Sequence, residues 1–398
     1  MRYDLIIVGG GLVGTSLAVS LRQSGLTIAL INARPPSNDD PRLFGLSQTS
    51  CQFLENLDIW NELALHATPI HAVHVSHRGR FGAVRLTRED ASLSSLGHVI
   101  PARLIEEILH QRMVENANIS LYCPATLLSL EQNASEVVVH LDTASGRQML
   151  TAPIVIGADG AASRVRSELR ISAEVVDYQQ SAIVTKTLLA RSHHHVAYER
   201  FNEHGAIAML PLPRNECATI WTSHTDDITR LMSMPEDAFL EALQTAFGYR
   251  LGRFRSISQR DTFPLCMTKA EKTVEQKVLL IGNAAHTLHP VAAQGFNLAL
   301  YEVAAISEAI LEKQGEQPLS AADLQRISDV TQRQRTMSVG LSHHLTQLFS
   351  TRSLVAGLFL QMGMTGLDMI PPLKKTFLNT MLGRVKSTPR LLLGGVHG

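Results

Sequence analysis

Three short apolar stretches stand out along the chain, and each runs into a turn that contains glycine: residues 3–8, 152–156 and 277–281. Continuous stretches of this length, rich in β-branched residues, are typical of strands that are buried on both faces of a sheet. After the first stretch, Leu12 to Ser24 has the pattern of a helix closed by Gly25, and Thr27 to Ile31 predicts the next strand. We therefore predict a β-α-β unit, and one sheet assembled from distant segments.

Other segments predict a second kind of structure. Residues 136–141 and 206–222 alternate between apolar and polar side chains, which predicts antiparallel strands. From Leu324 onward the apolar residues fall mostly three or four apart, which predicts helix. A very apolar stretch, Leu354 to Ile370, follows, and it is succeeded by two prolines and several basic residues.

Size and composition narrow the class of protein. The chain has 398 residues, which is longer than a domain with a single hydrophobic core usually is, so we expect two closely joined domains. It is 45% apolar and 18% charged, which suits a packed globular protein. Lys plus Arg and Asp plus Glu both number 36, so there is no basic surplus for a phosphate backbone and we expect no nucleic-acid partner.

The cysteines, histidines and the apolar amino end exclude further classes. The four cysteines form no C-x-x-C pair, which argues against a zinc site or disulfide framework and fits a reducing cytosol. Three adjacent histidines, His193 to His195, cannot all face one ion, so we interpret them as a solvated turn and predict no metal. Glycines interrupt the apolar stretch Leu5 to Leu21, so we expect neither a signal peptide nor a membrane span, a start at Met1, and a cytoplasmic protein.

The first motif with chemical content is Gly9-x-Gly11-x-x-Gly14, between a predicted strand and a predicted helix. In this setting it predicts a dinucleotide site, with the N–H groups at the helix start, from Leu12 on, directed at a pyrophosphate. The acidic residue usually found about 20 residues later, on the ribose hydroxyls, is replaced by Asn32. An amide can still bind the ribose but loses the charge-assisted hydrogen bond, so we expect weaker than average binding.

Two further motifs follow in order, Asp159-Gly160 to Arg166 and Gly282-Asn283-Ala284-Ala285-His286 to Asn297. With the glycine motif they carry a resemblance to FAD-dependent aromatic hydroxylases of the para-hydroxybenzoate hydroxylase type. Within that family the chain most resembles the 2-polyprenyl-6-methoxyphenol hydroxylases of ubiquinone biosynthesis. The likeness covers residues 1 to about 350 well and the tail poorly. It departs from the family at Ala293, where glycine is usual, and at Glu302, where aspartate is often found.

The resemblance implies which residues surround the cofactor. Asn283 would bond a ribityl hydroxyl, and the helix that begins at Gly295 would point its N–H groups at the flavin. Pro290 would shape the loop where oxygen reacts, and His286 is either a packed residue or a catalytic one, two interpretations that we hold equal. Arg166 would brace the Asp159 turn. The full set of predicted cofactor-binding residues is Gly9, Gly11, Leu12, Gly14, Asn32, Arg42, Arg103, Asp159, Gly282, Asn283, Pro290, Gly295, Phe296 and Asn297, with Pro290 and His286 as catalytic candidates.

The resemblance also implies a fold and an activity. The fold would be α/β, with a Rossmann-like, glutathione-reductase-like FAD-binding domain and an inserted antiparallel sheet. We expect an FAD-binding domain at 1–70, 100–178 and 263–340, a substrate domain at 71–99 and 179–262, and C-terminal helices at 341–398. The enzyme would hydroxylate a polyprenylated phenol with O2 and NADPH or NADH, through a flavin C4a-hydroperoxide.

Several alternatives stay open at this point. A sibling hydroxylase that acts on another ring position or another phenol has the same motifs, and a non-catalytic flavin-fold subunit of a biosynthetic assembly is the alternative outside enzymes. A polyprenyl chain stays in a bilayer or on an apolar surface, because each exposed carbon costs roughly 0.8 kcal/mol. The stretch Leu354 to Ile370 is then either a peripheral contact with the inner face of the cytoplasmic membrane or with partner proteins, or a helix packed on the chain's own core or in a homodimer.

Overall fold

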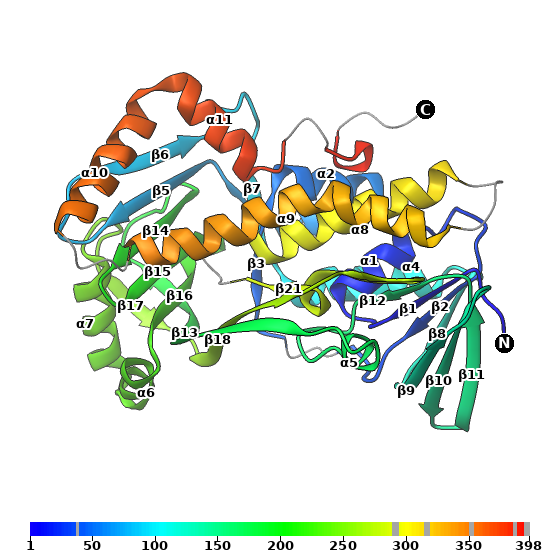
Figure 1. Ribbon diagram of the computed structural model, residues 1–398. Helices are drawn as coiled ribbons and strands as arrows, with labels where there is room; N and C mark the ends of the chain where they lie inside the picture. Colours follow the sequence, from blue (N-terminus) through cyan, green and yellow to red (C-terminus); the bar gives the residue numbers. More distant parts are fainter. Residues whose placement is uncertain (37–39, 289–293, 314–318, 350–353, 385–387, 394–398) are drawn as a thin grey trace.

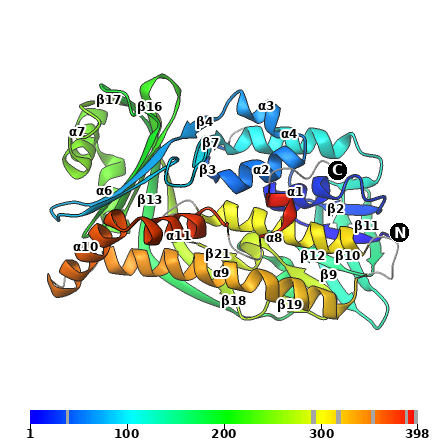
Figure 2. The same cartoon turned by 90° about the horizontal axis from the view of Figure 1, so that it is seen from above.

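The computed structural model describes residues 1–36, 40–288, 294–313, 319–349, 354–384 and 388–393 (Figure 1). Of residues 341–349 and 354–360 it describes the backbone only. The molecule has a layered half that contains the amino terminus and a second half built on a large, mostly antiparallel sheet. The long helix α9 (Ala321–Phe349) runs from the first half to the second, as Figure 2 shows from above.

A six-stranded sheet forms the centre of the first half, in the order β19-β20-β12-β1-β2-β8. All pairs are parallel except β19–β20. Successive side chains of a strand point to opposite faces, so Leu5 and Ile7 pack with the helices while Ile6 and Val8 pack with a three-stranded meander. The strands are β1 (Leu5–Val8), β2 (Ile28–Ile31), β8 (Ile119–Tyr122), β12 (Val155–Gly157), β19 (Val274–Glu275) and β20 (Val278–Leu280).

Helices cover one face of this sheet and the meander covers the other (Figure 1). The meander is β9 (Ala125–Gln132), β10 (Val137–Thr143) and β11 (Gly146–Ala152), and a small sheet lies beside the helices, β3 (Leu43–Ser47), β7 (Gly97–Pro101) and β4 (Thr68–Ile70). The helices of this half are α1 (Leu12–Ser20), α2 (Gln48–Asn56), α3 (Trp60–Ala64), α4 (Ala102–Val114), α5 (Arg164–Glu168) and α8 (Gln294–Glu312), with the single turns η2 (Gly282–Ala284) and η4 (Arg390–Leu392).

The second half is built on a nine-stranded sheet with the order β21-β18-β13-β16-β15-β14-β5-β6, in which β17 also pairs with β13. Helices α6 (Thr225–Ser233) and α7 (Glu236–Phe247) pack on one face, and α10 (Leu354–Met369) and α11 (Pro371–Met381) pack on the other. The strands are β5 (Ala72–His77), β6 (Ala83–Thr87), β13 (Ala173–Leu189), β14 (Val196–Asn202), β15 (Gly205–Pro211), β16 (Glu216–His224), β17 (Phe254–Ile257), β18 (Asp261–Ala270) and β21 (His286–Thr287), with the turn η1 (Pro213–Asn215) before β16.

Most predicted elements are present, and three predictions need correction. The first helix ends at Ser20 rather than Ser24, because turns with Leu21 to Ser24 replace its last part. The predicted strand 152–156 is two strands, since β11 ends at Ala152 and β12 begins at Val155. His193 is not solvated: its side chain is 6% exposed and its Nε2 lies 2.8 Å from the carbonyl oxygen of Leu212.

Two further expectations concern the apolar stretch Leu354 to Ile370 and the domain boundaries. The stretch Leu354 to Ile370 is helix α10 with the start of the next turn, and it packs on the chain's own β6, where Asp368 accepts a bond from the backbone N–H of Arg85. Within the described residues no helix is long and apolar enough to cross a membrane. Strand β13 runs across the boundary predicted after residue 178, so one strand belongs to both predicted domains.

Candidate active site

The glycine motif forms a tight turn between β1 and α1, and its three glycines have different surroundings. Gly9 has a φ of +115°, and a Cβ there would lie 2.3 Å from the carbonyl oxygen of Ala158. A Cβ on Gly14 would lie 1.9 Å from the oxygen of Gly9, so α1 packs directly on the turn. At Gly11, the first residue before the helix, a Cβ would meet nothing within 4 Å. The turn therefore leaves open space in front of the free N–H groups of α1.

Asn32 lies behind this turn at the end of β2. Its Nδ2 donates a 3.4 Å bond to the oxygen of Gly10, an oxygen that the hydroxyl of Thr15 also bonds. Asn32 thus supports the turn by a neutral contact, in the position where an acidic side chain was expected from the motif.

The second motif follows β12 and caps the start of helix α5. Asp159 accepts bonds from the hydroxyl of Ser163 at 2.5 Å and from the N–H of Val165 at 3.0 Å, so its carboxylate is used at the start of α5. Arg166 braces the turn as predicted, because it donates to the carbonyl oxygens of Ala161 and Ala284, each at 2.8 Å. These bonds join the second motif to the third.

The third motif begins at Gly282, whose φ is +55°, and passes through Asn283, which is exposed, to the buried His286. The N–H of Gly282 donates to Glu302 at 2.9 Å, and Arg335 of α9 donates to the same carboxylate at 2.9 Å. Glu302 is only 1% exposed, so this is a buried ion pair. Glu302, at the position where aspartate is often found, therefore anchors the start of the third motif to α8 and α9.

His286 is 2% exposed and packs beside this ion pair, with its Nδ1 3.8 Å from a Glu302 oxygen. Burial lowers the pKa of His286, and the charge of Arg335 adds to this effect, although Glu302 opposes it. A neutral imidazole is therefore favoured at this position. His286 is thus enclosed beside the pair of Glu302 and Arg335.

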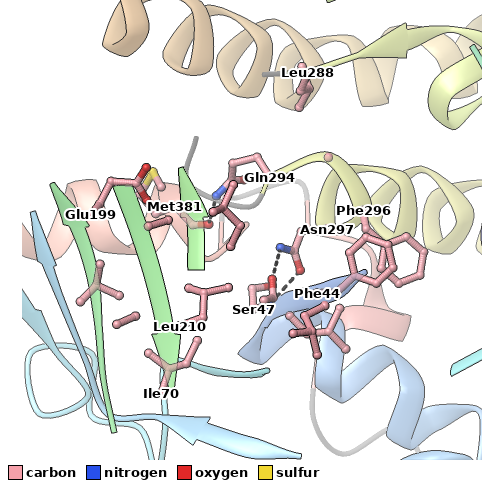
Figure 3. Close-up of a pocket in the computed structure, with 18 of the residues that line it drawn as sticks. Phe44, Ser47, Ile70, Glu199, Leu210, Leu288, Gln294, Phe296, Asn297 and Met381 are labelled. Carbon is pink, nitrogen blue, oxygen red and sulfur yellow. Dashed lines mark hydrogen bonds between the residues drawn. The ribbon is translucent and has the colours of Figure 1, made fainter. Parts of the chain in front are cut away.

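The first turn of α8 is fixed by the side chain of Asn297. Its oxygen accepts bonds from the N–H of Ser47 at 2.8 Å and the hydroxyl of Ser50 at 2.7 Å, and its amide donates to the oxygen of Gly45 at 2.9 Å. Figure 3 shows this bracket between α8 and β3. The bonds hold the N-terminus of α8 toward the same space that α1 faces.

One cavity of about 1190 Å³ joins these segments. Its lining includes seven of the predicted cofactor residues, which come from four separate segments: Gly11, Leu12, Arg42, Asn283, Gly295, Phe296 and Asn297. Gly160 and Ala158 also line it, so the second motif reaches the cavity through the neighbours of Asp159. The described lining does not include Gly9, Gly14, Asn32, Arg103, Asp159, Gly282 or His286. Pro290 lies outside the described residues.

The end of the cavity near α4 has two charged side chains in its described lining, Arg42 and Glu106. Arg42 donates three side-chain bonds to Asp40, and its guanidinium lies 5.6 Å from the centre of the Phe44 ring. Burial and the nearby Asp40 raise the pKa of Glu106, and Arg42 opposes this effect. Phe44 in turn packs against Phe296, with ring centres 4.8 Å apart.

The rest of the cavity is an apolar chamber between the large sheet and helices α10 and α11 (Figure 3). Sequence reasoning did not find this chamber, because its residues alternate along strands and helices like any core residue and only the fold leaves space between them. The side chains that line it include Ile70, Val73, Val75, Val84, Leu86, Glu199, Leu210, Ile220, Phe263, Leu265, Met364, Leu367, Phe377, Leu378, Met381 and Leu382.

Other site residues escaped prediction for a similar reason. Phe44 and Ser47 belong to β3, which has no motif of its own, and their role depends on the contact with α8. Glu106 lies on the face of α4 that turns to the cavity, while Arg103, three residues earlier, is exposed and lies outside the lining.

The residues present fit a dinucleotide cofactor with an extended shape. Three glycines from distant segments, Gly11, Gly160 and Gly295, line the cavity, and at each of them a Cβ would meet nothing within 4 Å. A ligand can therefore approach the backbone N–H groups of all three segments. In the part of the chain that the structure describes, no group of three His, Cys, Asp or Glu side chains is placed to hold a metal ion.

Comparison with known proteins agrees with this geometry. The family model described as "FAD binding domain" matches residues 2–321. The ubiquinone hydroxylase UbiL of Rhodospirillum rubrum is 29% identical over 401 residues, which cover 98% of this chain and 92% of UbiL. The 3-demethoxyubiquinol 3-hydroxylase of Escherichia coli is 28% identical over 316 residues, 77% of this chain and 79% of that enzyme.

A solved structure shows the same fold. The p-nitrophenol 4-monooxygenase PnpA of Pseudomonas putida superimposes with a TM-score of 0.79, covering 96% of this chain and 99% of PnpA at 14% identity. The fold expected from the sequence, an α/β FAD-binding unit with a second sheet and C-terminal helices, is therefore confirmed. FAD is the cofactor, and the monooxygenase reaction uses O2 and a reduced nicotinamide. The chain belongs to the FAD-binding family of flavoprotein monooxygenases.

Proposed function

We propose that this enzyme hydroxylates the ring of a polyprenylated phenol, of the 2-polyprenyl-6-methoxyphenol type, in ubiquinone biosynthesis. One observation carries the proposal: the cavity that begins at Gly11 continues without interruption into the apolar chamber under α10 and α11. The relatives named as ubiquinone hydroxylases support the pathway.

The residues around the glycine turn would hold FAD. We assign the pyrophosphate to the N–H groups after Gly11, the ribityl chain to Asn283, and the flavin ring to the space before Gly295 and Phe296. Bound FAD supplies electron transfer from NADPH or NADH and activation of O2. The protein contributes position and exclusion of water. Asn32, Asp159 and His286 would not touch FAD themselves but would support the turns that bind it.

The chamber suits a ring that carries an isoprenoid chain. Its walls are almost entirely aliphatic and aromatic, so they lower the free energy of an apolar chain by roughly 0.8 kcal/mol for each carbon removed from water. Met364 and Leu367 of α10 and Phe377 and Met381 of α11 form the wall opposite the sheet. A hydroxybenzoate without a chain would leave most of this volume unfilled.

The same two helices carry an apolar patch on the outside, which we define as Phe81, Met362, Met369, Ile370 and Leu373. Their side chains are 49–74% exposed. Met362 and Met369 are seven residues apart and lie on one side of α10, and the loop of Phe81 touches this helix, since Gly82 faces the oxygen of Gln361. With the exposed Arg78 and Lys375, this patch would contact an anionic membrane from which the substrate enters.

Turnover with a defined phenol tests the function. The purified enzyme with FAD, NADPH and 2-geranyl-6-methoxyphenol should give a product with one added oxygen atom that derives from labelled O2, identified by mass spectrometry, and NMR then gives the ring position. NADPH oxidation that yields only hydrogen peroxide with every prenylated phenol, and no oxygenated product, would refute the proposal.

A further inference from the structure

Arginine side chains gather on the side of the large sheet that carries α7, opposite the chamber. Successive residues of a strand point to opposite faces, and Val75 of β5 lines the cavity. His74 therefore faces the other side, as does Arg85 of β6, which lies in register with it. Arg200 of β14 lies in register with Ser76 and shares this face. Figure 1 shows these strands between α10 on one side and α7 on the other.

Arg200 reaches the end of α7 from this face. A Cβ added to Gly248, where the helix ends, would lie 3.7 Å from a guanidinium nitrogen of Arg200. Arg250 follows two residues later in the chain. The backbone N–H of Arg78 donates to the oxygen of Phe201 at 2.8 Å, so Arg78 begins beside the same strand. Three segments therefore contribute to one arginine cluster, which consists of Arg78, Arg85, Arg200 and Arg250.

The charges of the arginine cluster are not compensated by its surroundings. In the described part of the molecule, no Asp or Glu side chain forms an ion pair with the cluster. Asp368, which accepts a bond from the backbone N–H of Arg85, pairs with Lys374 at 3.3 Å. Burial lowers the pKa of Arg200, and the charges of Arg250 and Arg78 lower it further. The end of α7 offers only about half a negative charge, so the cluster favours an additional anion.

Two buried nitrogen atoms among these side chains are without a hydrogen-bond partner in the described structure, Nε of Arg200 and Nδ1 of His74. Unpaired buried polar atoms are unfavourable. His74 is 8% exposed, and burial lowers its pKa, an effect to which the charge of Arg250 adds, so a neutral imidazole with one N–H donor is favoured. A guanidinium offers a planar set of N–H donors that match the oxygens of a phosphate group. Charge and donors together therefore suit a phosphate.

We propose that the arginine cluster binds the phosphate headgroup of an anionic phospholipid, an inference that rests on the membrane contact in the proposed function. The hairpin that carries Arg78 also carries Phe81 of the apolar patch, three residues later, and β6 of this hairpin is the last strand of the sheet. The cluster and the patch therefore meet at one edge of the molecule. The patch would enter the apolar layer while the cluster holds the headgroups above it.

A soluble dinucleotide such as NADPH has the same phosphate chemistry. Its nicotinamide must reach the flavin, however, and we assign the flavin to the cavity, which lies on the opposite face of the sheet from Arg85 and Arg200. The lipid is therefore the better match for the arginine cluster, and NADPH is an alternative that the experiment separates.

Vesicle binding by the FAD-loaded enzyme tests this inference. Arg78→Gln, Arg85→Gln and Arg250→Gln together remove three exposed charges and leave Arg200 at the end of α7, so the fold should be retained. We expect this triple variant to bind phosphatidylglycerol vesicles roughly 100-fold more weakly than the wild type, since each arginine near a membrane surface contributes about fivefold. Binding to phosphatidylcholine vesicles, which depends on the apolar patch, should stay within about twofold.

The control variant removes the same number of charges elsewhere. Arg147, Arg214 and Arg255 are exposed and lie outside the arginine cluster, and their combined replacement by Gln gives the same net charge as the first variant. It should bind both kinds of vesicle within about threefold of the wild type, because charges farther than a Debye length from the lipid are screened. The KM for NADPH, measured by NADPH oxidation, should be the same in all three proteins.

Each other outcome overturns a different statement. Equal binding of phosphatidylglycerol by the two triple variants would overturn the headgroup site and leave the membrane contact of the patch in place. A raised KM for NADPH in the cluster variant, with vesicle binding unchanged, would assign the arginine cluster to the soluble coenzyme instead. If the wild type binds neither kind of vesicle, the membrane contact in the proposed function fails, and the headgroup site fails with it.

Discussion

The glycines of the first turn belong to one motif but have different roles, one in folding and one in cofactor binding. Gly14 packs against the oxygen of Gly9, whereas Gly11 faces open space. We expect Gly11→Glu to fold normally and to lose FAD, because its charged side chain would occupy the assigned pyrophosphate site. The ratio of flavin to protein absorbance, with circular dichroism on the same sample, measures both properties.

Gly14→Ala provides the contrast to that variant. Its Cβ would lie 1.9 Å from a backbone oxygen, so this change should lower the thermal midpoint of unfolding even when FAD is in excess. If Gly11→Glu retains a normal flavin content, the cofactor does not lie where we place it.

His98 gives the fold a dependence on pH. Burial lowers its pKa from 6.5 to about 4, and the charge of His71 contributes. The unfolded chain therefore takes up a proton below pH 6.5 while the folded chain resists until about pH 4, so stability is lost as the pH falls through this range. Urea unfolding at pH 7 and pH 5 should show a smaller difference for His98→Asn than for the wild type. His66→Asn, at an exposed histidine, should not change that difference.

The contact between helices α8 and α9 depends on the buried pair of Glu302 and Arg335. Arg335→Met should destabilise the protein by about 3–5 kcal/mol, because it leaves a buried carboxylate without its cation. The double variant with Glu302→Gln should be more stable than the single one, since no charge then remains. Urea denaturation measures both free energies of unfolding.

A surface pair provides the comparison. Lys272 forms an ion pair with Glu275, and its side chain is 53% exposed. Lys272→Met breaks this pair and should lower the free energy of unfolding by less than about 1 kcal/mol. If Arg335→Met is no more costly than this variant, the buried pair does not anchor the third motif as we describe.

The sequence predicted those elements whose local pattern decides their structure. Strands that end in glycine turns were found, because Gly9 and Gly282 have positive φ values that few other residues adopt. The sequence could not show which face of α4 meets the cavity, so Arg103 was chosen and Glu106 was missed. Nor could it show that the Asn297 side chain bonds β3, since that contact joins residues 250 positions apart.

On the scale of the entire enzyme, the membrane contact that we propose for the apolar patch would give the molecule a defined orientation. Phe81→Ser, Met369→Ser and Leu373→Ser together should reduce co-sedimentation with vesicles of anionic phospholipid at least tenfold, since each buried apolar side chain contributes roughly 1.5–3 kcal/mol. The matched control replaces three exposed apolar residues elsewhere, Leu65, Val114 and Met149, and should bind as the wild type. Equal binding by all three proteins would exclude the patch as the contact.

The cavity wall is closed by residues near the end of the chain, and this has a consequence for biosynthesis. The parallel sheet is complete once β20 has been made, but α11, with Leu378 and Met381, leaves the ribosome last of all the lining segments. A nascent or proteolysed chain that lacks α10 and α11 would keep the nucleotide turn but have a chamber open to water. We expect such a fragment to release more hydrogen peroxide for each NADPH oxidised than the chain that retains both helices.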